Sequence, residues 1–427
     1  MIDKSTIEEI KARSDLVTVV ESYGVQLRKS GRNYAGLCPF HENSKTPAFS
    51  VNHERQTWRC FGSCGVGGDV IAFVQRQERC NFHTALELLG NKCGVQLSVR
   101  PKSPEVKKRD ELLTESADYF HQLLLSAPQA EAARQYVRSR GLLRRSVKGF
   151  KLGYSLPSWN DCLQHFTRKG YTVDDLLSTG LAAKGEKGGV YDRFRNRLMF
   201  PICLTSGQVV GFGARTLEPD GVPKYLNSPQ SKHFDKSRLL YGLNFARQGM
   251  RRTGEVIIVE GYMDAIRSHE AGFSNTVATM GTALSADQLH IVARASHRIV
   301  IALDADEAGS AAAMRVIEMA QRLISAESNI DADIYIATMP EGSDPDDVIS
   351  NDPQQFALLI VDAQTVVDYV LEHLTSGTDL SSIKLKRDIA AKMRPLIMSV
   401  RDLVERDGYW RLLADRLNVS YDALVSG

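Results

Sequence analysis

Three apolar runs in this chain each lead into acidic residues. The runs and the carboxylates that follow them are Val256–Val259 with Glu260 and Asp264, Ile299–Leu303 with Asp304 and Asp306, and Ile334–Ala337 with Asp344 and Asp346. Such runs predict strands that are buried on both faces of a parallel sheet. Because ligands bind at the edge formed by the carboxyl ends of parallel strands, we expect these carboxylates to lie together. Clustered carboxylate oxygens suit hard divalent cations such as Mg²⁺, which often bridge to phosphates.

A second set of residues has the spacing of metal ligands. Cys38 and His41 form a Cys-x-x-His pair, and Cys60 and Cys64 form a Cys-x-x-x-Cys pair. Two close-spaced pairs separated by a short β segment are typical of a structural Zn²⁺ site, and four such ligands leave no open position for a substrate. The alternative is a set of unrelated buried thiols beside a surface histidine, which the paired spacing disfavours. The odd total of seven cysteines also argues against a disulfide framework.

Charge is distributed unevenly along the chain, although the net charge is only +2. Residues 101–253 carry 26 Lys and Arg against 14 Asp and Glu, whereas residues 254–427 carry 14 against 27. A basic region beside an acidic, metal-binding region predicts an enzyme that binds a polyanion and does metal chemistry on it. The alternative is that both regions are ordinary solvated surfaces.

The basic region contains residue types that bind nucleic acid. Arg193, Arg195 and Arg197 alternate along the chain, so an extended backbone would place all three on one face. Arginine forks suit bidentate binding of phosphate, and lysines act as point charges. Tyr225 could stack on a base, and Asn227 could bond to a ribose or a base.

Aromatic and basic residues also alternate around the cysteines. These residues are Arg32, Tyr34, Lys45, Phe49, Trp58, Arg59 and Phe61. Such a ribbon can stack on and track a single nucleic-acid strand. We expect at least half of the aromatic side chains to form a small core around the metal instead, which leaves the basic residues as the better candidates for contacts.

Composition and element spacing divide the chain into successive regions. We expect a cysteine-rich domain over residues 1–100, a linker over 101–113, a basic mixed α+β subdomain over 114–253, a parallel α/β subdomain over 254–350 and a helical bundle over 351–427. No apolar run approaches the length of a membrane span, and the first residues lack signal-peptide character. We therefore expect a cytoplasmic location.

The acidic motifs support a resemblance to a known domain. Glu260-Gly261 joined to Asp304-Ala305-Asp306 resembles the Toprim domain, which bacterial-type primases, type IA and type II topoisomerases and some nucleases share; Met280-Gly281-Thr282 matches its glycine turn. The zinc cluster, the motifs at residues 192–195 and 223–229, and the final Asp344-Pro345-Asp346 occur in the order found in bacterial DnaG-type primases. Glu-Gly or Asp-x-Asp alone would be a weak signal, but together the motifs are highly specific, and the resemblance covers essentially all 427 residues.

This resemblance implies a fold and an activity. The fold would be an α/β multidomain protein with an N-terminal zinc ribbon, a mixed α+β basic subdomain, a Toprim α/β parallel sheet and a C-terminal helical bundle. The activity would be synthesis of short RNA primers de novo on single-stranded DNA from ribonucleoside triphosphates. The nucleotidyl transfer would depend on metal ions and need no protein nucleophile.

The resemblance also implies roles for individual residues. Cys38, His41, Cys60 and Cys64 would hold one structural Zn²⁺ in a domain that helps to select the template start site. Glu260, Asp304 and Asp306 would be the catalytic ligands of two or more Mg²⁺ or Mn²⁺ ions, supported by Asp264, Asp344 and Asp346. The residues implied in binding template or nucleotide are Arg193, Arg195, Arg215, Lys224, Tyr225, Asn227 and Lys236.

Two departures from the family pattern stand out. Ser63 is an apparent extra residue between Cys60 and Cys64, where the family usually has Cys-x-x-Cys. Family members usually continue into a helical domain that binds the replicative helicase, whereas only 77 residues follow residue 350 here. We expect these residues to form the bundle that closes the polymerase core, and the usual helicase-binding domain to be absent, either because the chain was cut or because the protein lacks it. The replicative helicase stays a possible partner. We also expect the protein to be a monomer.

Two other classes of function compete with the primase. Another Toprim enzyme is the first, but a topoisomerase needs a strand-passage domain with a nucleophilic tyrosine, for which the chain has no room; a nuclease-like enzyme stays open. A non-catalytic zinc-dependent nucleic-acid-binding protein is the second. The intact set of Glu260, Asp304 and Asp306 argues against it, because uncompensated carboxylates are costly to retain without a purpose.

Overall fold

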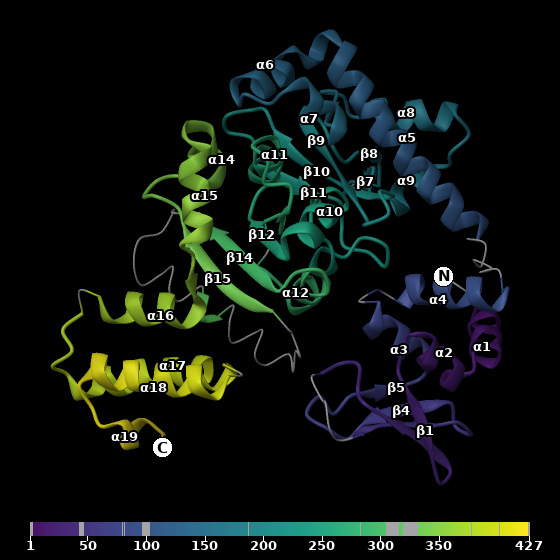
Figure 1. Cartoon of the computed structure of the whole chain (residues 1–427). Coiled ribbons are helices and arrows are strands. Elements are labelled where there is room, and N and C mark those ends of the chain that lie inside the picture. Colours follow the sequence, from purple (N-terminus) through teal and green to yellow (C-terminus); the bar gives the residue numbers. More distant parts are fainter. Residues whose placement is uncertain are drawn as a thin grey trace. The chain divides into compact units, whose positions relative to one another are not determined.

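The computed structural model divides into two compact units, Met1–Pro104 and Glu105–Gly427 (Figure 1). The structure describes residues 3–41, 47–78, 80, 82–95, 103–186, 188–281, 283–304, 316–318, 332–376, 378–400 and 402–425.

In its described residues, the first unit combines four helices with one antiparallel sheet. The helices are α1 (Lys4–Arg13), α2 (Leu16–Ser22), α3 (Val70–Gln77) and α4 (Phe82–Cys93), and the strands are β1 (Leu27–Ser30), β2 (Asn33–Gly36), β3 (Phe49–Asn52), β4 (Thr57–Cys60) and β5 (Gly67–Gly68). The sheet has the order β1-β2-β3-β4-β5, so each strand pairs with its neighbour along the chain. This meander brings the start of β3 beside the end of β4, because Phe49 lies opposite Cys60.

Aromatic side chains form the core of the first unit. Phe49 and Trp58 are buried and stacked, with ring centroids 5.3 Å apart, and Phe73 from α3 packs on both. The buried Trp58 indole N–H donates a 3.0 Å hydrogen bond to the Asp69 carbonyl. Phe61 differs from them, because 73% of it is exposed and the Arg59 guanidinium lies 5.7 Å from its ring centre. Among these aromatic residues, Phe61 is therefore the one available for contacts outside the unit.

In the N-terminal half of the second unit, helices pack around a small antiparallel sheet. Its helices are α5 (Pro104–Ser126), η1 (Pro128–Ala130), α6 (Glu131–Ser139), α7 (Arg144–Gly149), α8 (Asp161–Arg168), α9 (Val173–Ser178), η2 (Lys236–Arg238) and α10 (Leu243–Thr253). Its strands are β6 (Gly153–Ser155), β7 (Ala182–Lys184), β8 (Val190–Asp192), β9 (Arg197–Cys203), β10 (Val209–Thr216) and β11 (Tyr225–Asn227). The main sheet has the order β11-β10-β9-β6, and β7 pairs with β8.

Residues 104–113, which the sequence assigns to a linker, are helical. They form the first turns of α5, and Leu112 and Leu113 are buried in a cluster with Phe212 of β10. Pro104 does not prevent a helix here, because it stands at the first helical position, where proline is well tolerated.

The second half of the unit contains a mostly parallel sheet of order β13-β12-β14-β15-β16. Its strands are β12 (Glu255–Val259), β13 (Thr276–Ala278), β14 (Arg298–Leu303), β15 (Asp333–Thr338) and β16 (Gln364–Thr365). The helices around it are α11 (Tyr262–Glu270), α12 (Ala286–Ala293), α14 (Pro345–Asn351) and α15 (Pro353–Val361). The three apolar runs of the sequence correspond to β12, β14 and β15, which pair in parallel, whereas β16 is a two-residue antiparallel edge.

The two larger sheets of the second unit are joined through α11. A Cβ atom added to Gly213 of β10 would lie 2.3 Å from the Tyr262 side chain, so a larger residue would not fit there. The Tyr262 ring also stacks on Phe200 of β9, with ring centroids 4.8 Å apart. This contact places the start of α11 directly against the basic subdomain.

A helical bundle follows the parallel sheet, as the apolar spacing predicts. It consists of α16 (Val366–Thr375), α17 (Ile383–Ser399), α18 (Leu403–Leu417) and α19 (Tyr421–Val425), and α16, α17 and α18 lie together in Figure 1. Tyr369, Met393 and Leu413 are buried at its centre. Within the part of the chain that the structure describes, no helix is long and apolar enough to cross a membrane.

Candidate metal and nucleic-acid sites

The four predicted zinc ligands lie together at one end of the meander. The ligand atoms of Cys38, His41, Cys60 and Cys64 are all within 4.8 Å of one another. The sulfurs of Cys38 and Cys64 are 3.7 Å apart, and the Cys60 sulfur is 3.9 Å from His41 Nδ1. Sulfurs held tetrahedrally about 2.3 Å from one zinc ion stand about 3.8 Å apart, so this donor set fits a closed zinc site.

The second ligand pair closes in spite of the extra residue between Cys60 and Cys64. The Gly62 backbone N–H donates a 3.2 Å hydrogen bond to the Cys60 sulfur, as the supporting groups of metal ligands commonly do. A Cβ on Gly62 would lie 3.0 Å from His41 Nε2, so glycine lets the turn approach the histidine closely. Gly65 has φ +58 and completes the turn after Cys64.

Two of the predicted carboxylates follow neighbouring strands at the carboxyl edge of the parallel sheet. Glu260 follows the last residue of β12, and Asp304 follows the last residue of β14, and these two strands are direct neighbours. Both side chains are partly exposed. Asp306, the third predicted catalytic metal ligand beside Glu260 and Asp304, lies outside the described residues.

Asp264 lies behind this edge on the first turn of α11. Its Oδ2 accepts a 2.9 Å hydrogen bond from the Gly261 N–H, and only 6% of the residue is exposed. Burial, followed by the charges of Asp304, Asp344 and Asp346, raises the pKa of Asp264 well above its ordinary value. Carboxylate charge concentrated in this way favours a divalent cation, so the residues present fit a divalent metal.

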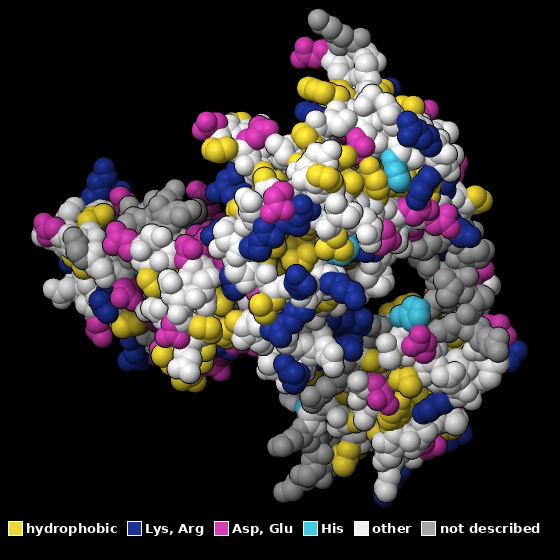
Figure 2. All heavy atoms as spheres, turned by 90° about the horizontal axis from the view of Figure 1, so that it is seen from above, with side chains coloured by type: hydrophobic (Ala, Val, Ile, Leu, Met, Phe, Trp, Pro, Cys, Tyr) yellow, Lys and Arg dark blue, Asp and Glu magenta, His cyan; other side chains and the backbone are white. Residues whose placement is uncertain are grey.

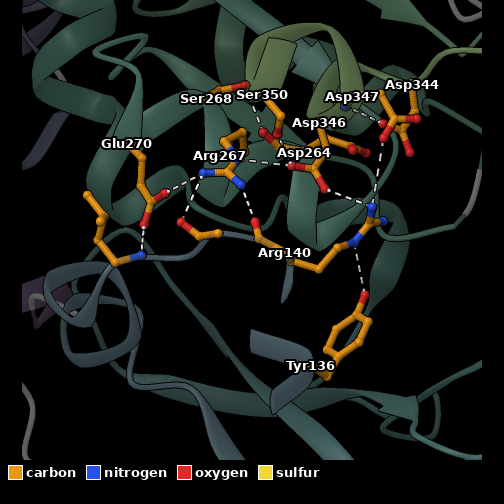
Figure 3. Close-up of polar contacts among 12 residues, drawn as sticks. Tyr136, Arg140, Asp264, Arg267, Ser268, Glu270, Asp344, Asp346, Asp347 and Ser350 are labelled. Atoms are coloured by element: carbon orange, nitrogen blue, oxygen red, sulfur yellow. Dashed lines mark hydrogen bonds and ion pairs between the residues drawn. The ribbon is translucent and has the colours of Figure 1, made fainter. Parts of the chain in front are cut away.

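Asp344 and Asp346 have different surroundings although only Pro345 separates them. Asp344 caps α14, with its Oδ1 accepting a 2.8 Å hydrogen bond from the Asp347 N–H, and burial raises its pKa. Asp346 is 2% exposed and pairs with two arginines: its Oδ1 is 3.1 Å from Arg267 Nε and its Oδ2 is 3.4 Å from Arg140 Nη1 (Figure 3). The structure therefore places Asp346 in an internal ion pair.

Two of the predicted nucleic-acid contacts line one pocket. It has a volume of about 360 Å³, and its walls include Arg193, Arg195, Arg197 and Trp159. The three arginines do not lie on one extended strand as predicted: β8 ends at Asp192, β9 begins at Arg197, and Asn196 between them has φ +50. They reach the same pocket through this turn. Figure 2 shows several Lys and Arg side chains close together near the middle of the face it presents.

The other predicted contacts lie outside this pocket wall. Lys224 and Tyr225 are exposed, and Lys236 is half-buried, with a pKa lowered by burial and by the charge of Arg193. The Arg215 guanidinium lies 4.0 Å from the centre of the Tyr136 ring. Lys236 is thus near the pocket arginines, whereas Arg215 faces α6.

Asn227 is committed to contacts within the protein. Its Oδ1 accepts a 2.6 Å hydrogen bond from the Tyr262 hydroxyl, and its Nδ2 donates a 3.2 Å hydrogen bond to the Met280 carbonyl. Arg193 donates to the Asn227 carbonyl at 3.0 Å. The sequence suggested that Asn227 could bond to a ribose or a base, but here its amide joins β11 to the acidic subdomain.

Sequence reasoning missed three side chains at these sites. Trp159 is 65% exposed, and the Arg195 guanidinium lies 4.2 Å from its ring centre. The one signal in the sequence was a tryptophan two residues after Pro157 and outside the apolar runs. The other two are Arg140 and Arg267, which both contact Asp346. They lie far from Asp346 in the sequence, and no motif connects them with it.

Family models match four successive segments of the chain. They are described as a CHC2 zinc finger (residues 2–105), the N-terminal domain of the DNA primase catalytic core (119–247), a Toprim-like domain (257–349) and the DnaB-helicase binding domain of primase (367–421). The first and third matches support the presence of zinc and of a divalent-metal site.

Curated relatives match over almost the whole chain. The DNA primase of Clostridium acetobutylicum is 37% identical over 99% of this chain and 70% of the relative, and that of Halalkalibacterium halodurans is 36% identical over 99% and 70%. Solved structures of primases also match this chain. The structure of the zinc-binding and RNA polymerase domains of the Aquifex aeolicus primase matches with a TM-score of 0.62 and 29% sequence identity. This match covers 99% of each chain. A DnaG primase catalytic domain bound to single-stranded DNA has a TM-score of 0.63, with 30% identity and 74% and 100% covered.

The expectation that the helicase-binding domain is absent is wrong. The matching family model covers α16, α17, α18 and the first residue of α19. The error has a simple cause: the number of residues after position 350 and their apolar spacing are compatible with more than one kind of helical bundle. Residue count alone could not tell a bundle that closes a polymerase core from one that belongs to a helicase-binding family.

Proposed function

Because the chain belongs to the bacterial DnaG-type DNA primases, which make RNA primers, we propose how its own residues carry out this synthesis on single-stranded DNA. The observation that carries the proposal is the position of Glu260 and Asp304 at the carboxyl ends of the neighbouring strands β12 and β14. No observation favours a topoisomerase or a nuclease, and the relatives described above are primases.

Glu260, Asp304 and Asp306 are the proposed ligands of two or more Mg²⁺ or Mn²⁺ ions, with Asp264 and Asp344 beside them. When bound, such ions neutralise the triphosphate of the incoming nucleotide and make a ribose 3′-hydroxyl a better nucleophile. The neighbouring strands hold Glu260 and Asp304 on a rigid edge, and rigid placement is what catalysis by positioning requires. The chain supplies no covalent nucleophile in this scheme.

Basic side chains bind the nucleotide and the template in this proposal. Arg193, Arg195 and Lys236 hold phosphates, because the two arginines share a pocket wall and Lys236 lies close enough for Arg193 to lower its pKa. The exposed Lys224 and Tyr225 contact the template, together with Arg215. The likeness to a DnaG catalytic domain bound to single-stranded DNA supports a single-stranded template.

Asn227 has a positioning role in the proposal, since its side chain bonds to Tyr262 and to the Met280 carbonyl. The zinc unit assists with the template. Cys38, His41, Cys60 and Cys64 hold its structure, and the exposed Phe61 beside Arg59 offers a stacking surface for a base. The boundaries given above for the four regions other than the linker, and a cytoplasmic location, belong to the same proposal.

An unprimed reaction tests the function. The full chain is incubated with single-stranded DNA, ribonucleoside triphosphates and Mg²⁺, and the products are resolved by gel. Short RNA products that vanish without template support the proposal. Synthesis that is equal without template, or no synthesis with either Mg²⁺ or Mn²⁺, would refute it.

The helical bundle has a separate proposed partner. The match to a helicase-binding family supports binding of the replicative helicase by residues 367–421. Leu403 and Val404 at the start of α18 are exposed apolar side chains in this range and are the proposed contacts. Changing both to serine should weaken binding in a pull-down, whereas Leu358→Ser on α15, also exposed but outside the match, should not. Equal binding by all variants would exclude this surface.

A further inference from the structure

Arg267 occupies the centre of a buried polar network on α11. Only 15% of its side chain is exposed. Its Nε pairs with Asp346 at 3.1 Å, and its Nη1 contacts Glu270 at 3.1 Å and donates to the Gly141 carbonyl at 3.2 Å. Its Nη2 donates to the Arg140 carbonyl. Every nitrogen of the guanidinium is therefore used inside the protein, as Figure 3 shows.

Asp346 is enclosed from the opposite side as well. Arg140 Nη1 lies 3.4 Å from its Oδ2, and the Ser350 hydroxyl donates to its Oδ1 at 3.4 Å. Arg140 is itself held by the Tyr136 hydroxyl, which lies 3.3 Å from its Nε. Both oxygens of a carboxylate that is only 2% exposed thus have cationic partners from two different helical segments.

Asp344, on the same turn, is more exposed than Asp346. It is half-buried, and its contact with the turn is the 2.8 Å hydrogen bond that caps α14. The charges of Asp344 and Asp346 both act on Asp264, which lies behind the edge where Glu260 and Asp304 follow β12 and β14, called the metal edge below. Since Asp344 is the cap of α14 and Asp346 lies in the first turn, fixing the position of Asp346 also fixes the position of Asp344.

We propose that Arg267 is a positioning residue of the acidic site: together with Arg140 it anchors Asp346 as an internal ion pair, so that Asp346 holds the turn that presents Asp344 and is not a metal ligand. This inference rests on the proposed function, because it concerns the same metal edge. Arg267 is suited to the role because one side chain ties the Asp344 turn to α11, the helix that begins two residues after Glu260. A planar guanidinium with several donors fixes orientation in a way that a lysine cannot.

The competing interpretation is that Asp346 is a metal ligand and that the arginines only occupy it until a metal arrives. A charge-balanced double variant, Arg267→Gln with Asp346→Asn, separates the two, because it removes one positive and one negative charge. The number of Mn²⁺ ions bound per chain is measured by electron paramagnetic resonance of the free ion. We expect the same number as in the wild type. Loss of one bound ion would overturn the proposal.

Arg267→Lys tests the positioning role, because it keeps the charge and loses the fork. We expect the melting temperature to fall by about 5 °C and the affinity for Mn²⁺ to fall roughly fivefold, because the Asp344 turn loosens. Arg298→Lys is the matched control. Arg298 pairs with Glu255 at the first residues of β14 and β12, at the opposite end of the same sheet. It should lower the melting temperature without changing Mn²⁺ affinity, and equal Mn²⁺ affinity in the two lysine variants would overturn the positioning role.

Failure of this inference can be told from failure of the proposed function. A wild-type chain that binds no Mn²⁺, or a Glu260→Gln variant that binds as the wild type does, would contradict the proposed metal edge itself. If the wild type binds Mn²⁺ and Glu260→Gln weakens it, the edge stands. The results for Arg267 and Asp346 then decide this inference alone.

Discussion

The Tyr262 hydroxyl donates a 2.6 Å hydrogen bond to the Asn227 side-chain oxygen and so connects the first residue of α11 to the last residue of β11. The same asparagine donates to the carbonyl of Met280, and the Met280 N–H donates a 3.1 Å hydrogen bond to the Glu260 carbonyl. The Asn227 side chain thus connects β11, in the sheet of the basic subdomain, to Glu260 at the carboxyl end of β12.

Asn227→Ala should weaken both stability and synthesis. It leaves the buried Tyr262 hydroxyl without its acceptor, which costs about 1–3 kcal/mol of unfolding free energy. Primer synthesis should fall roughly tenfold, because Glu260 is displaced relative to the basic sheet. Thermal melting and the unprimed reaction measure the two effects.

Tyr262→Phe is the matched control for that prediction. It removes the hydroxyl and leaves Asn227 in place, so we expect a smaller loss of synthesis and of stability in the same direction. If Asn227 acted by touching the nucleotide instead, Tyr262→Phe would leave synthesis unchanged.

The sequence predicted those parts of the site that depend on short-range patterns. The strands β12, β14 and β15 are recognisable because each is a run of apolar residues, and Glu260 and Asp304 follow two of them directly. Cys38 with His41 and Cys60 with Cys64 are recognisable because each pair is closely spaced, and a meander brings the pairs together. Apolar runs and close ligand spacing are local features, so the sequence alone is enough to predict these strands and ligands.

Long-range pairing could not be predicted in the same way. Asp346 looked equivalent to Asp344, yet its ion pairs come from Arg267 and Arg140, which are far away in the sequence. In the sequence Asn227 looked available for a ligand, yet its side-chain oxygen accepts a hydrogen bond from the Tyr262 hydroxyl. Such contacts depend on how α6, α11 and α14 pack, and no local pattern records that packing.

Asp304→Ala should abolish primer synthesis and leave binding of single-stranded DNA largely intact. The side chain lies at the metal edge, whereas the arginines proposed to bind phosphate lie around the separate pocket. We expect a loss of at least about a hundredfold in synthesis. A fluorescence-anisotropy titration with a labelled single strand measures binding. The control is Asp333→Ala, which removes an exposed carboxylate at the first residue of β15 and should change neither quantity. Retained synthesis in the Asp304 variant would exclude it as a metal ligand.

Removal of zinc should loosen the first unit and spare the second. The unit has a small core, and four ligands brought together from separate turns supply much of its stability only when a metal joins them. Limited proteolysis after treatment with a chelator should produce new cleavages within residues 1–104 and none within 105–427. Cys64→Ser should reproduce the effect, whereas Cys80→Ser, a thiol outside the cluster, should not. A cleavage pattern that the chelator leaves unchanged would contradict the four ligands.

The stability of the second unit should depend on pH through His269. This side chain on α11 is packed against Phe150 and Phe245, and its Nε2 is 2.9 Å from the Thr276 carbonyl. Burial lowers its pKa below the ordinary value of 6.5. The folded protein therefore binds this proton less readily than the unfolded chain. The stability that neutral His269 supports is complete above about pH 6.5 and is lost as the pH falls toward the lower pKa of the folded state, by at most about 1.4 kcal/mol per pH unit.

His269→Gln isolates this contribution, because glutamine keeps an N–H donor for the Thr276 carbonyl and does not titrate in this range. The difference in unfolding free energy between the wild type and this variant is measured by urea denaturation at several values of pH from 7.5 to 5. The wild type should lose stability relative to the variant as the pH falls below about 6.5. A difference that stays constant across this range would show that His269 accepts its proton equally well in the folded and unfolded chains. A difference that changes in favour of the wild type as the pH falls would show that the folded chain accepts the proton more readily, and either result would contradict the prediction.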